Sequence, residues 1–322
     1  MSIKIAGIYC TPRSMSISFE QRRVLHWCGS GLALAGILFV GFRLHSYWIE
    51  LDSSRITSMN WEGIIALSVI YGAANLLLAM AWWHLLQFLG ASVNRTVSIR
   101  IYGVSQLAKY LPGNIFHLAG RQALGMAENI AGWILIKSSA FELGLIAVAG
   151  ALFGLSVLSL IWNEFQVSTG MFLQVGTCVL VALMLAKLIG RHAMWAFVWQ
   201  TSFLLISGSV FVVLLNIISG SETLFAKHSV TIGAAFIVAW LAGLVTPGAP
   251  AGVGIREVVL FFLLKTVASE SDLLLSLLLS RIVTVFGDIW FYLAASLCLV
   301  RGKNLEPTNK ENVTDAPPDS TY

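Results

Sequence analysis

Long apolar runs dominate this chain of 322 residues and limit how it can fold. Hydrophobic residues make up 57% of the sequence and charged residues 11%, whereas soluble domains carry about a quarter charged residues. The runs are far too long for buried strands, and they lack the alternating pattern of an outer-membrane barrel. Because helices are the remaining element that can span a bilayer, the sequence predicts an all-α fold, a polytopic helical bundle.

A helix needs about 20 apolar residues to cross a bilayer, and six runs meet this length. The first run follows a basic amino terminus, as a signal peptide would, but its full length and the later spans favour an uncleaved span. We therefore expect a cytoplasmic segment at residues 1–23, a transmembrane domain at 24–302 and a polar, disordered cytoplasmic tail at 303–322. The six predicted spans are residues 24–45, 62–90, 131–161, 170–190, 193–219 and 273–300.

Two further segments, residues 98–126 and 229–268, are apolar but broken by Pro and Gly. Each arm of the second segment is short for a full crossing. Non-helical backbone at membrane depth is tolerated where it is buried in protein or faces water. We therefore expect two re-entrant helical hairpins, each entering and leaving on one side. The predicted breaks are Pro112, Gly113, Pro247, Gly248, Pro250, Gly252 and Gly254.

The positive charges test this topology, because cytoplasmic flanks of membrane spans carry an excess of Lys and Arg. With both termini in the cytoplasm, ten basic residues lie on inner flanks and four on outer flanks. The hairpins then enter from opposite sides, as in inverted-repeat transporters, and can meet near the midplane. The inner residues are Lys4, Arg13, Arg22, Arg23, Arg95, Arg100, Lys187, Arg191, Arg301 and Lys303. The outer residues are Arg43, Arg55, Lys227 and Lys265.

Arg121 and Arg256 each lie nine residues after the proline of a Pro-Gly pair. A charged side chain in hydrocarbon costs a few kcal/mol or more, so an arginine in a broken apolar segment usually lines a polar pathway. Each guanidinium is a candidate for holding a lipid phosphate by bidentate hydrogen bonds. The alternatives are snorkelling to the headgroups or pairing with a structural carboxylate. Glu257 is next to Arg256, but adjacent helical residues point about 100° apart.

Three charged residues lie inside predicted spans. Glu142 is about 16 Å into its span, where it is either protonated or paired with a cation from a hairpin. Arg281 and Asp288 are seven residues apart on one helical face, too far apart to bond directly. We expect each to meet a different helix, in a structural ion pair or in a pathway.

Polar residues also surround the first break: Lys109, Tyr110, Asn114 and His117. These side chains could bind a phosphorylated head group, or they could satisfy backbone groups freed by the break. The other histidines show no metal-ligand spacing, and the chain has no Walker loop, nucleophile elbow or dinucleotide fingerprint. We therefore predict no metal, no cofactor, no catalytic residues and no nucleic-acid partner.

Two motifs, KYLPGNIFHLAGR (Lys109 to Arg121) and PAGVGIRE (Pro250 to Glu257), resemble the paired signatures of the lysylphosphatidylglycerol synthase transmembrane family. That family includes the flippase half of the multiple peptide resistance factors. The similarity covers about residues 20–302. It implies a flippase-like domain with two re-entrant hairpins in the bacterial inner membrane. The chain lacks the soluble aminoacyl-transferase domain of those members, which leaves the substrate open.

The function expected from the sequence is translocation of an anionic or phosphate-bearing lipid, either an aminoacyl phospholipid or a polyprenyl-phosphate-linked glycan precursor. Arg121 and Arg256 would receive the head group, with Glu142, Glu257, Arg281 and Asp288 nearby. The partners would be the lipid and envelope glycan or lipid-modifying enzymes. The alternative is a non-transporting membrane enzyme or scaffold in lipid-linked glycan assembly, for which Glu50, Asp52 and Glu62 form the one outer carboxylate cluster.

Overall fold

The computed structural model describes residues 58–111, 115–162, 166–220, 222–246 and 254–303, together with Glu20 and Val24. All regular elements in these ranges are helices, which confirms the predicted all-α class. All of the predicted span 24–45 except Val24, and most of both predicted terminal segments, lie outside the described residues. The elements are α2 (Ser58–Phe88), α3 (Arg95–Gln106), η2 (Leu107–Tyr110), α4 (Phe116–Ala127), α5 (Gly132–Leu152), α6 (Gly154–Ile161), α7 (Val167–Leu188), α8 (Arg191–Ser219), α9 (Glu222–Val245), α10 (Ile255–Leu264) and α11 (Glu270–Lys303).

Six stretches of the described helices are long and apolar enough to cross a membrane. Five coincide with predicted spans and lie in α2, in α5 with α6, and in α7, α8 and α11. The sixth is His228–Val245 in α9, which the sequence had assigned to a short hairpin arm. This arm is longer than the sequence indicated, because α9 runs for 24 residues, about 36 Å at 1.5 Å per residue.

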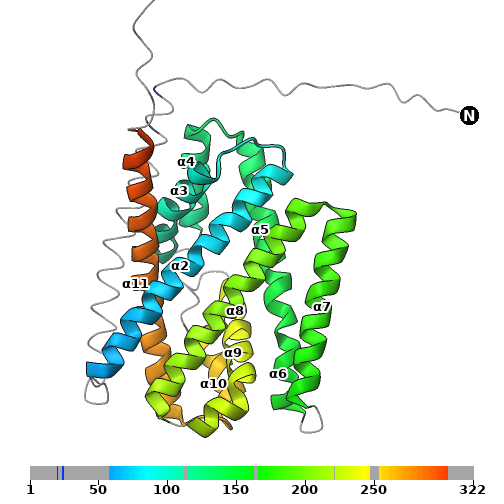
Figure 1. Cartoon of the computed structure of the whole chain (residues 1–322), viewed down its shortest axis with the longest axis vertical. Coiled ribbons are helices and arrows are strands. Elements are labelled where there is room, and N and C mark those ends of the chain that lie inside the picture. The colour runs from blue at the N-terminus through cyan, green and yellow to red at the C-terminus, as the bar shows by residue number, and fades with distance from the viewer. Residues whose placement is uncertain are drawn as a thin grey trace, which may run out of the picture.

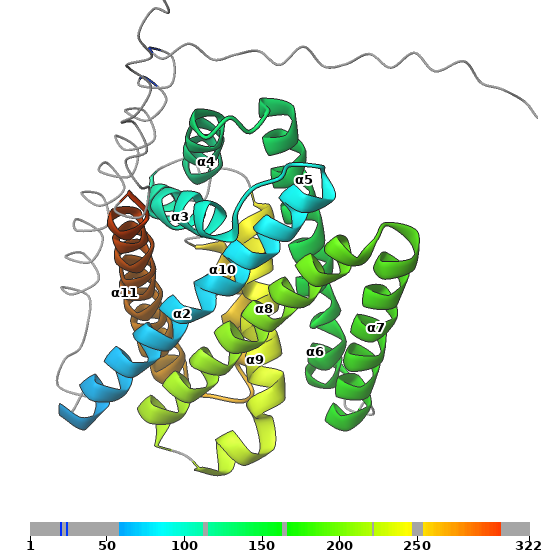
Figure 2. The ribbon, with the colours of Figure 1, turned by 45° about the horizontal axis from the view of Figure 1, so that its top comes forward.

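The helices alternate in direction between the two ends of the bundle (Figure 1). At the upper end, α2 ends and α5 begins, and α3 and α4 lie beside them, toward α11. At the lower end, α8 ends and both α9 and α11 begin, so the segment containing α9 and α10 starts and finishes there. The turned view places α10 near the middle of the bundle, behind α2 and α8 (Figure 2).

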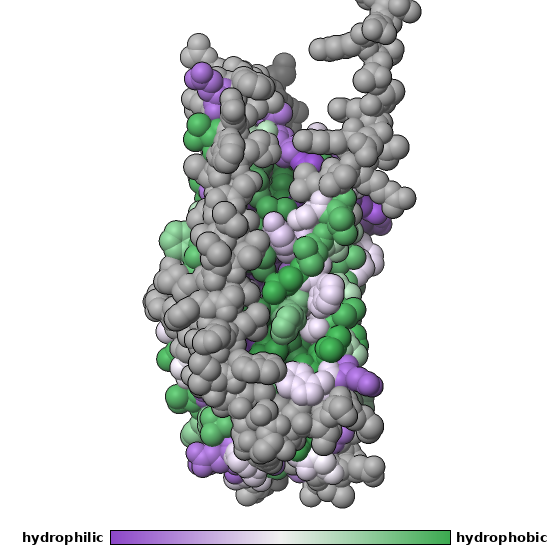
Figure 3. All heavy atoms as spheres, turned by 90° about the vertical axis from the view of Figure 1, so that its left-hand side faces the viewer, coloured by the Kyte–Doolittle hydropathy of each residue, from purple (hydrophilic) through white to green (hydrophobic). Residues whose placement is uncertain are grey.

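The outer surface matches a membrane environment. In the face shown in Figure 3, the described side chains are mostly hydrophobic along the middle, and hydrophilic residues gather toward the two ends. Burial differs sharply among the spans: 67% of the apolar stretch of α11 is buried, against 6% for α7. Helix α11 is therefore a central element, and α7 lies at the edge with its apolar side chains exposed.

Both interrupted segments have local causes for their breaks. Leu111 adopts an extended conformation (φ −64°, ψ 141°) after the 3₁₀ turn η2, as expected for a residue before proline. Gly254 has a φ of +90°, a conformation that glycine adopts without steric cost, and α10 begins at the next residue. Residues 112–114 and 247–253, with most of the predicted break residues, lie outside the described ranges.

Helices α2 and α11 cross at two glycines. A Cβ added at Gly287 would lie 2.8 Å from the Ser68 carbonyl oxygen and 2.9 Å from the Gly72 backbone nitrogen. A Cβ at Gly72 would in turn lie 2.8 Å from the Gly287 carbonyl oxygen. Small residues allow helix backbones in membranes to approach this closely, so that van der Waals contact can hold them together.

We predict that Gly287→Ala destabilises the protein by about 1–3 kcal/mol, because the new methyl group meets backbone atoms that cannot rotate away. Unfolding of the purified protein in detergent micelles measures the effect. Gly176→Ala on α7 is the matched control, since no atom lies within 4 Å of its added Cβ. Equal stability of the two variants would contradict the close crossing.

Candidate functional site

A cavity of about 150 Å³ lies inside the bundle and receives side chains from both interrupted segments. The first segment contributes α3, η2 and α4, and the second contributes α9 and α10. Its charged and polar lining residues are Tyr71, Tyr102, Gln106, Lys109, Tyr110, His117, Glu142, Trp240, Arg256 and Arg281, and its apolar lining is Leu78, Leu143, Ile146, Phe203, Gly243 and Leu244. An apolar cavity with a few converging polar groups is the usual form of a ligand site.

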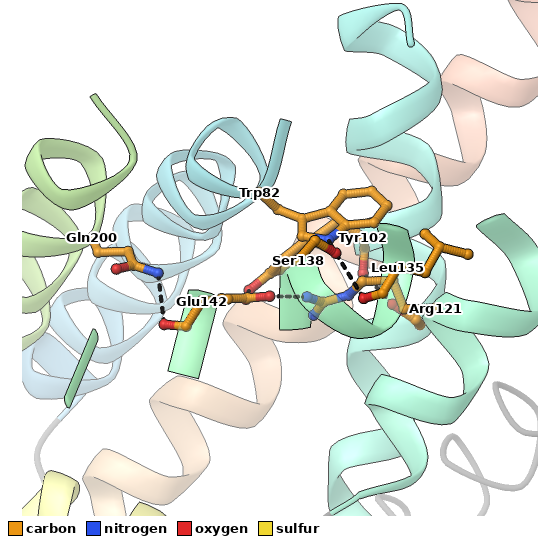
Figure 4. A network of polar contacts seen from close by, with 8 residues as sticks. Trp82, Tyr102, Arg121, Leu135, Ser138, Glu142 and Gln200 are labelled. Atoms are coloured by element: carbon orange, nitrogen blue, oxygen red, sulfur yellow. Dashed lines mark hydrogen bonds and ion pairs between the residues drawn. The ribbon is translucent and has the colours of Figure 1, made fainter. Parts of the chain in front are cut away.

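Glu142 of α5 is held by three groups from other helices (Figure 4). Arg121 Nη1 of α4 donates to its Oε2, and Tyr102 Oη of α3 donates to its Oε1 at 2.9 Å. Gln200 Nε2 of α8 donates to its backbone carbonyl at 3.1 Å. The prediction that Glu142 meets a cation from a hairpin segment is confirmed.

Arg121 is committed to this cluster. It is 1% exposed, and its guanidinium lies 3.8 Å from the Tyr102 ring centroid and 5.4 Å from that of Trp82. The cavity reaches Glu142 and Tyr102 but does not touch Arg121, which lies behind them. Arg121 thus pairs with a carboxylate, as in the alternative structural interpretation, while its Nε is buried without a hydrogen-bond partner among the described residues.

Asp288 of α11 joins a second cluster and is fully buried. Lys109 Nζ lies 2.7 Å from its Oδ2, and Tyr110 Oη donates to the same oxygen. Asn75 Nδ2 of α2 donates to Oδ1 at 3.0 Å. This carboxylate therefore connects the first interrupted segment to α2 and α11, and Lys109 is the cation of this cluster that faces the cavity.

Arg281 of α11 joins the other interrupted segment. Its Nε donates to Glu257 Oε1 of α10 at 3.0 Å, and its Nη2 donates to the same oxygen. Glu257 Oε2 also accepts from the Gly254 backbone nitrogen at 2.6 Å, at the start of α10. Arg281 and Asp288 thus meet different elements, as predicted, and Glu257 pairs with Arg281 rather than with its neighbour Arg256.

Arg256 differs from the other cations of the cavity. It is 6% exposed, and its guanidinium lies 4.1 Å from the centroid of the Phe236 ring. Its Nε and Nη2 are buried and have no hydrogen-bond partner, and no carboxylate among the described residues forms an ion pair with it. A buried charge without a counter-ion is costly, so this arginine is the group around the cavity most in need of an anion.

Six of the predicted site residues line the cavity, and three others lie directly behind it in ion pairs. Asn114 lies outside the described residues, as do Glu50 and Asp52, while Glu62 is exposed at the start of α2. In the described ranges no three His, Cys, Asp or Glu side chains come together as metal ligands. The six lining residues are Lys109, Tyr110, His117, Glu142, Arg256 and Arg281.

The sequence reasoning missed several residues that complete these clusters. Tyr102 and Gln106 precede Lys109 and Tyr110 at helical spacing, which puts them on one face and could have revealed them. Asn75 is an amide in the middle of an apolar span, a position where polar groups usually serve a purpose. Nothing in the sequence indicates that Trp240 lines a cavity, because tryptophans in membrane spans commonly contact lipid.

Sequence profiles of protein families, curated proteins and solved structures were compared with the chain, and none of the three comparisons found a match. The resemblance of the two motifs to the lysylphosphatidylglycerol synthase transmembrane family therefore stays a prediction.

We predict that Arg121→Met alone destabilises the protein by about 3–5 kcal/mol, because it leaves Glu142 buried without its cation. The double variant Arg121→Met, Glu142→Met should be closer to wild type, since apolar side chains of similar size replace both charges. Free energies of unfolding in detergent micelles give both values. A double variant as unstable as the sum of the two single variants would show that the pair is not coupled.

Proposed function

We propose that this protein is a lipid translocase that moves a lipid with an anionic or phosphate-bearing head group across a bacterial inner membrane. The observation that carries the proposal is Arg256, a buried guanidinium with no carboxylate partner among the described residues, in a cavity inside an apolar helical bundle. Guanidinium groups bind phosphate by paired, charge-assisted hydrogen bonds, and binding would supply the missing counter-ion.

The proposed route follows the two interrupted segments. Each starts and finishes at one end of the bundle, the first at the upper end and the second at the lower end in Figure 1. We propose that both are re-entrant and that they form an inverted pair, so that the cavity lies where they meet. Movement of one half of the bundle against the other would then open the cavity to each side in turn. The lipid chains would stay in the bilayer while the head group passes through.

The substrate class follows from the same chemistry. A phospholipid and a polyprenyl-phosphate-linked glycan precursor both carry a phosphate that Arg256 can bind. The motif resemblance supports lipid transfer of this kind. Envelope glycan or lipid-modifying enzymes would be the partners that supply or consume the lipid.

We predict that Arg256→Gln reduces transfer of the lipid to the leak rate of protein-free liposomes. The substitution removes Arg256, the cation in the described lining of the cavity that has no carboxylate partner and is free to bind the anionic head group. Transfer of phosphatidylglycerol and of a polyprenyl-phosphate-linked hexose is measured by exposure of the head group to a membrane-impermeant reagent. Arg256→Lys should retain part of the activity, since the charge remains but the two-pronged hydrogen bonding is lost.

Arg191→Gln provides the matched control, because it makes the same chemical change at an exposed arginine at the start of α8. This variant should transfer both lipids at the wild-type rate. If wild-type protein transfers neither lipid, or if Arg256→Gln transfers them as fast as Arg191→Gln, the proposed function is wrong.

A further inference from the structure

In the described part of the chain, the charges around the cavity are balanced except at one position. The cations Lys109 and Arg281 face the cavity, but each has a carboxylate behind it, Asp288 and Glu257 respectively. Glu142 is the carboxylate that lines the cavity, and it has Arg121 behind it. Three cations and three carboxylates are therefore matched, and Arg256 supplies a surplus of one positive charge.

A head group with two or more negative charges would need a second cation. The cation would have to come from the Lys109–Asp288 pair or from the Arg281–Glu257 pair. Asp288 is fully buried, so removing Lys109 from it would leave an uncompensated carboxylate in the interior. The surplus of one charge thus matches a phosphodiester and disfavours a diphosphate.

A head group with an ammonium would need a free carboxylate, and the described lining of the cavity offers none. Both oxygens of Glu142 are already bound, Oε2 by Arg121 and Oε1 by Tyr102 (Figure 4). An ammonium could bind Glu142 only by displacing the buried Arg121 guanidinium. It would also lie in the same cavity as the unpaired Arg256, which would repel it.

The remaining lining fits neutral hydroxyl groups. His117 Nδ1 is buried and has no hydrogen-bond partner among the described residues, and the side chain borders the cavity. The Tyr71 and Trp240 side chains and the Gln106 amide also border it. Such uncharged donors and acceptors beside apolar surface typically orient a polar ligand without adding charge.

We infer that the cavity selects a phosphodiester head group with one net negative charge and a neutral, hydroxylated substituent, and that it rejects ammonium-bearing and diphosphate head groups. This inference rests on the proposed function and narrows it to one substrate class. A phosphatidyl polyol and a polyprenyl-phosphate-linked sugar both have this chemistry. An aminoacylated phospholipid and a polyprenyl-diphosphate-linked sugar do not.

Competition binding to the full-length protein in detergent, followed by native mass spectrometry, tests the selection. The equimolar mixture contains phosphatidylglycerol, lysylphosphatidylglycerol, phosphatidylethanolamine, and a hexose linked to a polyprenyl chain by a monophosphate or by a diphosphate. We expect phosphatidylglycerol or the monophosphate-linked hexose to bind at least about tenfold more tightly than its mismatched counterpart, as expected for one charged hydrogen bond gained or lost. The tighter of these two identifies the source of the phosphodiester.

The outcomes separate this inference from the proposed function. Tighter or equal binding of lysylphosphatidylglycerol or of the diphosphate lipid overturns the inference and leaves lipid translocation standing. Binding of none of the five lipids overturns both. The variant Arg256→Gln should bind phosphatidylglycerol and phosphatidylethanolamine about equally, whereas Arg191→Gln should keep the wild-type preference. An unchanged preference in Arg256→Gln overturns the assignment of the surplus charge to Arg256.

Discussion

Five charged side chains of the described bundle are buried, and the need to compensate those charges arranges the polar interior. These side chains are Arg121, Glu142, Arg256, Arg281 and Asp288. Burying an ion without a partner costs several kcal/mol, more than a typical packing contact returns. Each buried carboxylate therefore joins elements that are distant in sequence: Glu142 joins α5 to α3 and α4, and Asp288 joins α11 to η2 and α2. These pairs add polar contacts that hold the short elements of the first interrupted segment against the long helices.

Ion pairing also distinguishes the two motif arginines. Arg121 and Arg256 each follow a Pro-Gly pair at the same spacing, yet among the described residues Arg121 has a carboxylate on a neighbouring helix and Arg256 has none. A shared local spacing thus does not give the two arginines the same environment. Arg121 is packed behind the cavity, and Arg256 borders the cavity itself.

The sequence was sufficient for the fold class and for five of the spans, because hydropathy over 20 residues depends on composition and not on partners. It gave too short a length for α9, because this helix begins at Glu222, among polar residues that precede the apolar arm. It also placed the charged residues near one site but could not distinguish their roles. The partner of Arg121 lies 21 positions away on another helix, and a local motif contains no information on that contact. The angle of about 100° between adjacent helical residues did predict one contact correctly, because it indicated that Glu257 would point away from Arg256.

The glycine crossing of α2 and α11 has a mechanical consequence. The two backbones touch at Gly72 and Gly287, so a slide of one helix along the other would push the neighbouring Tyr71 or Trp290 side chain into the contact. Rotamer changes cannot relieve a clash between backbones, so we expect the two helices to move together. Conformational changes in the interior should therefore take place in the elements packed around α2 and α11, which move relative to this crossing.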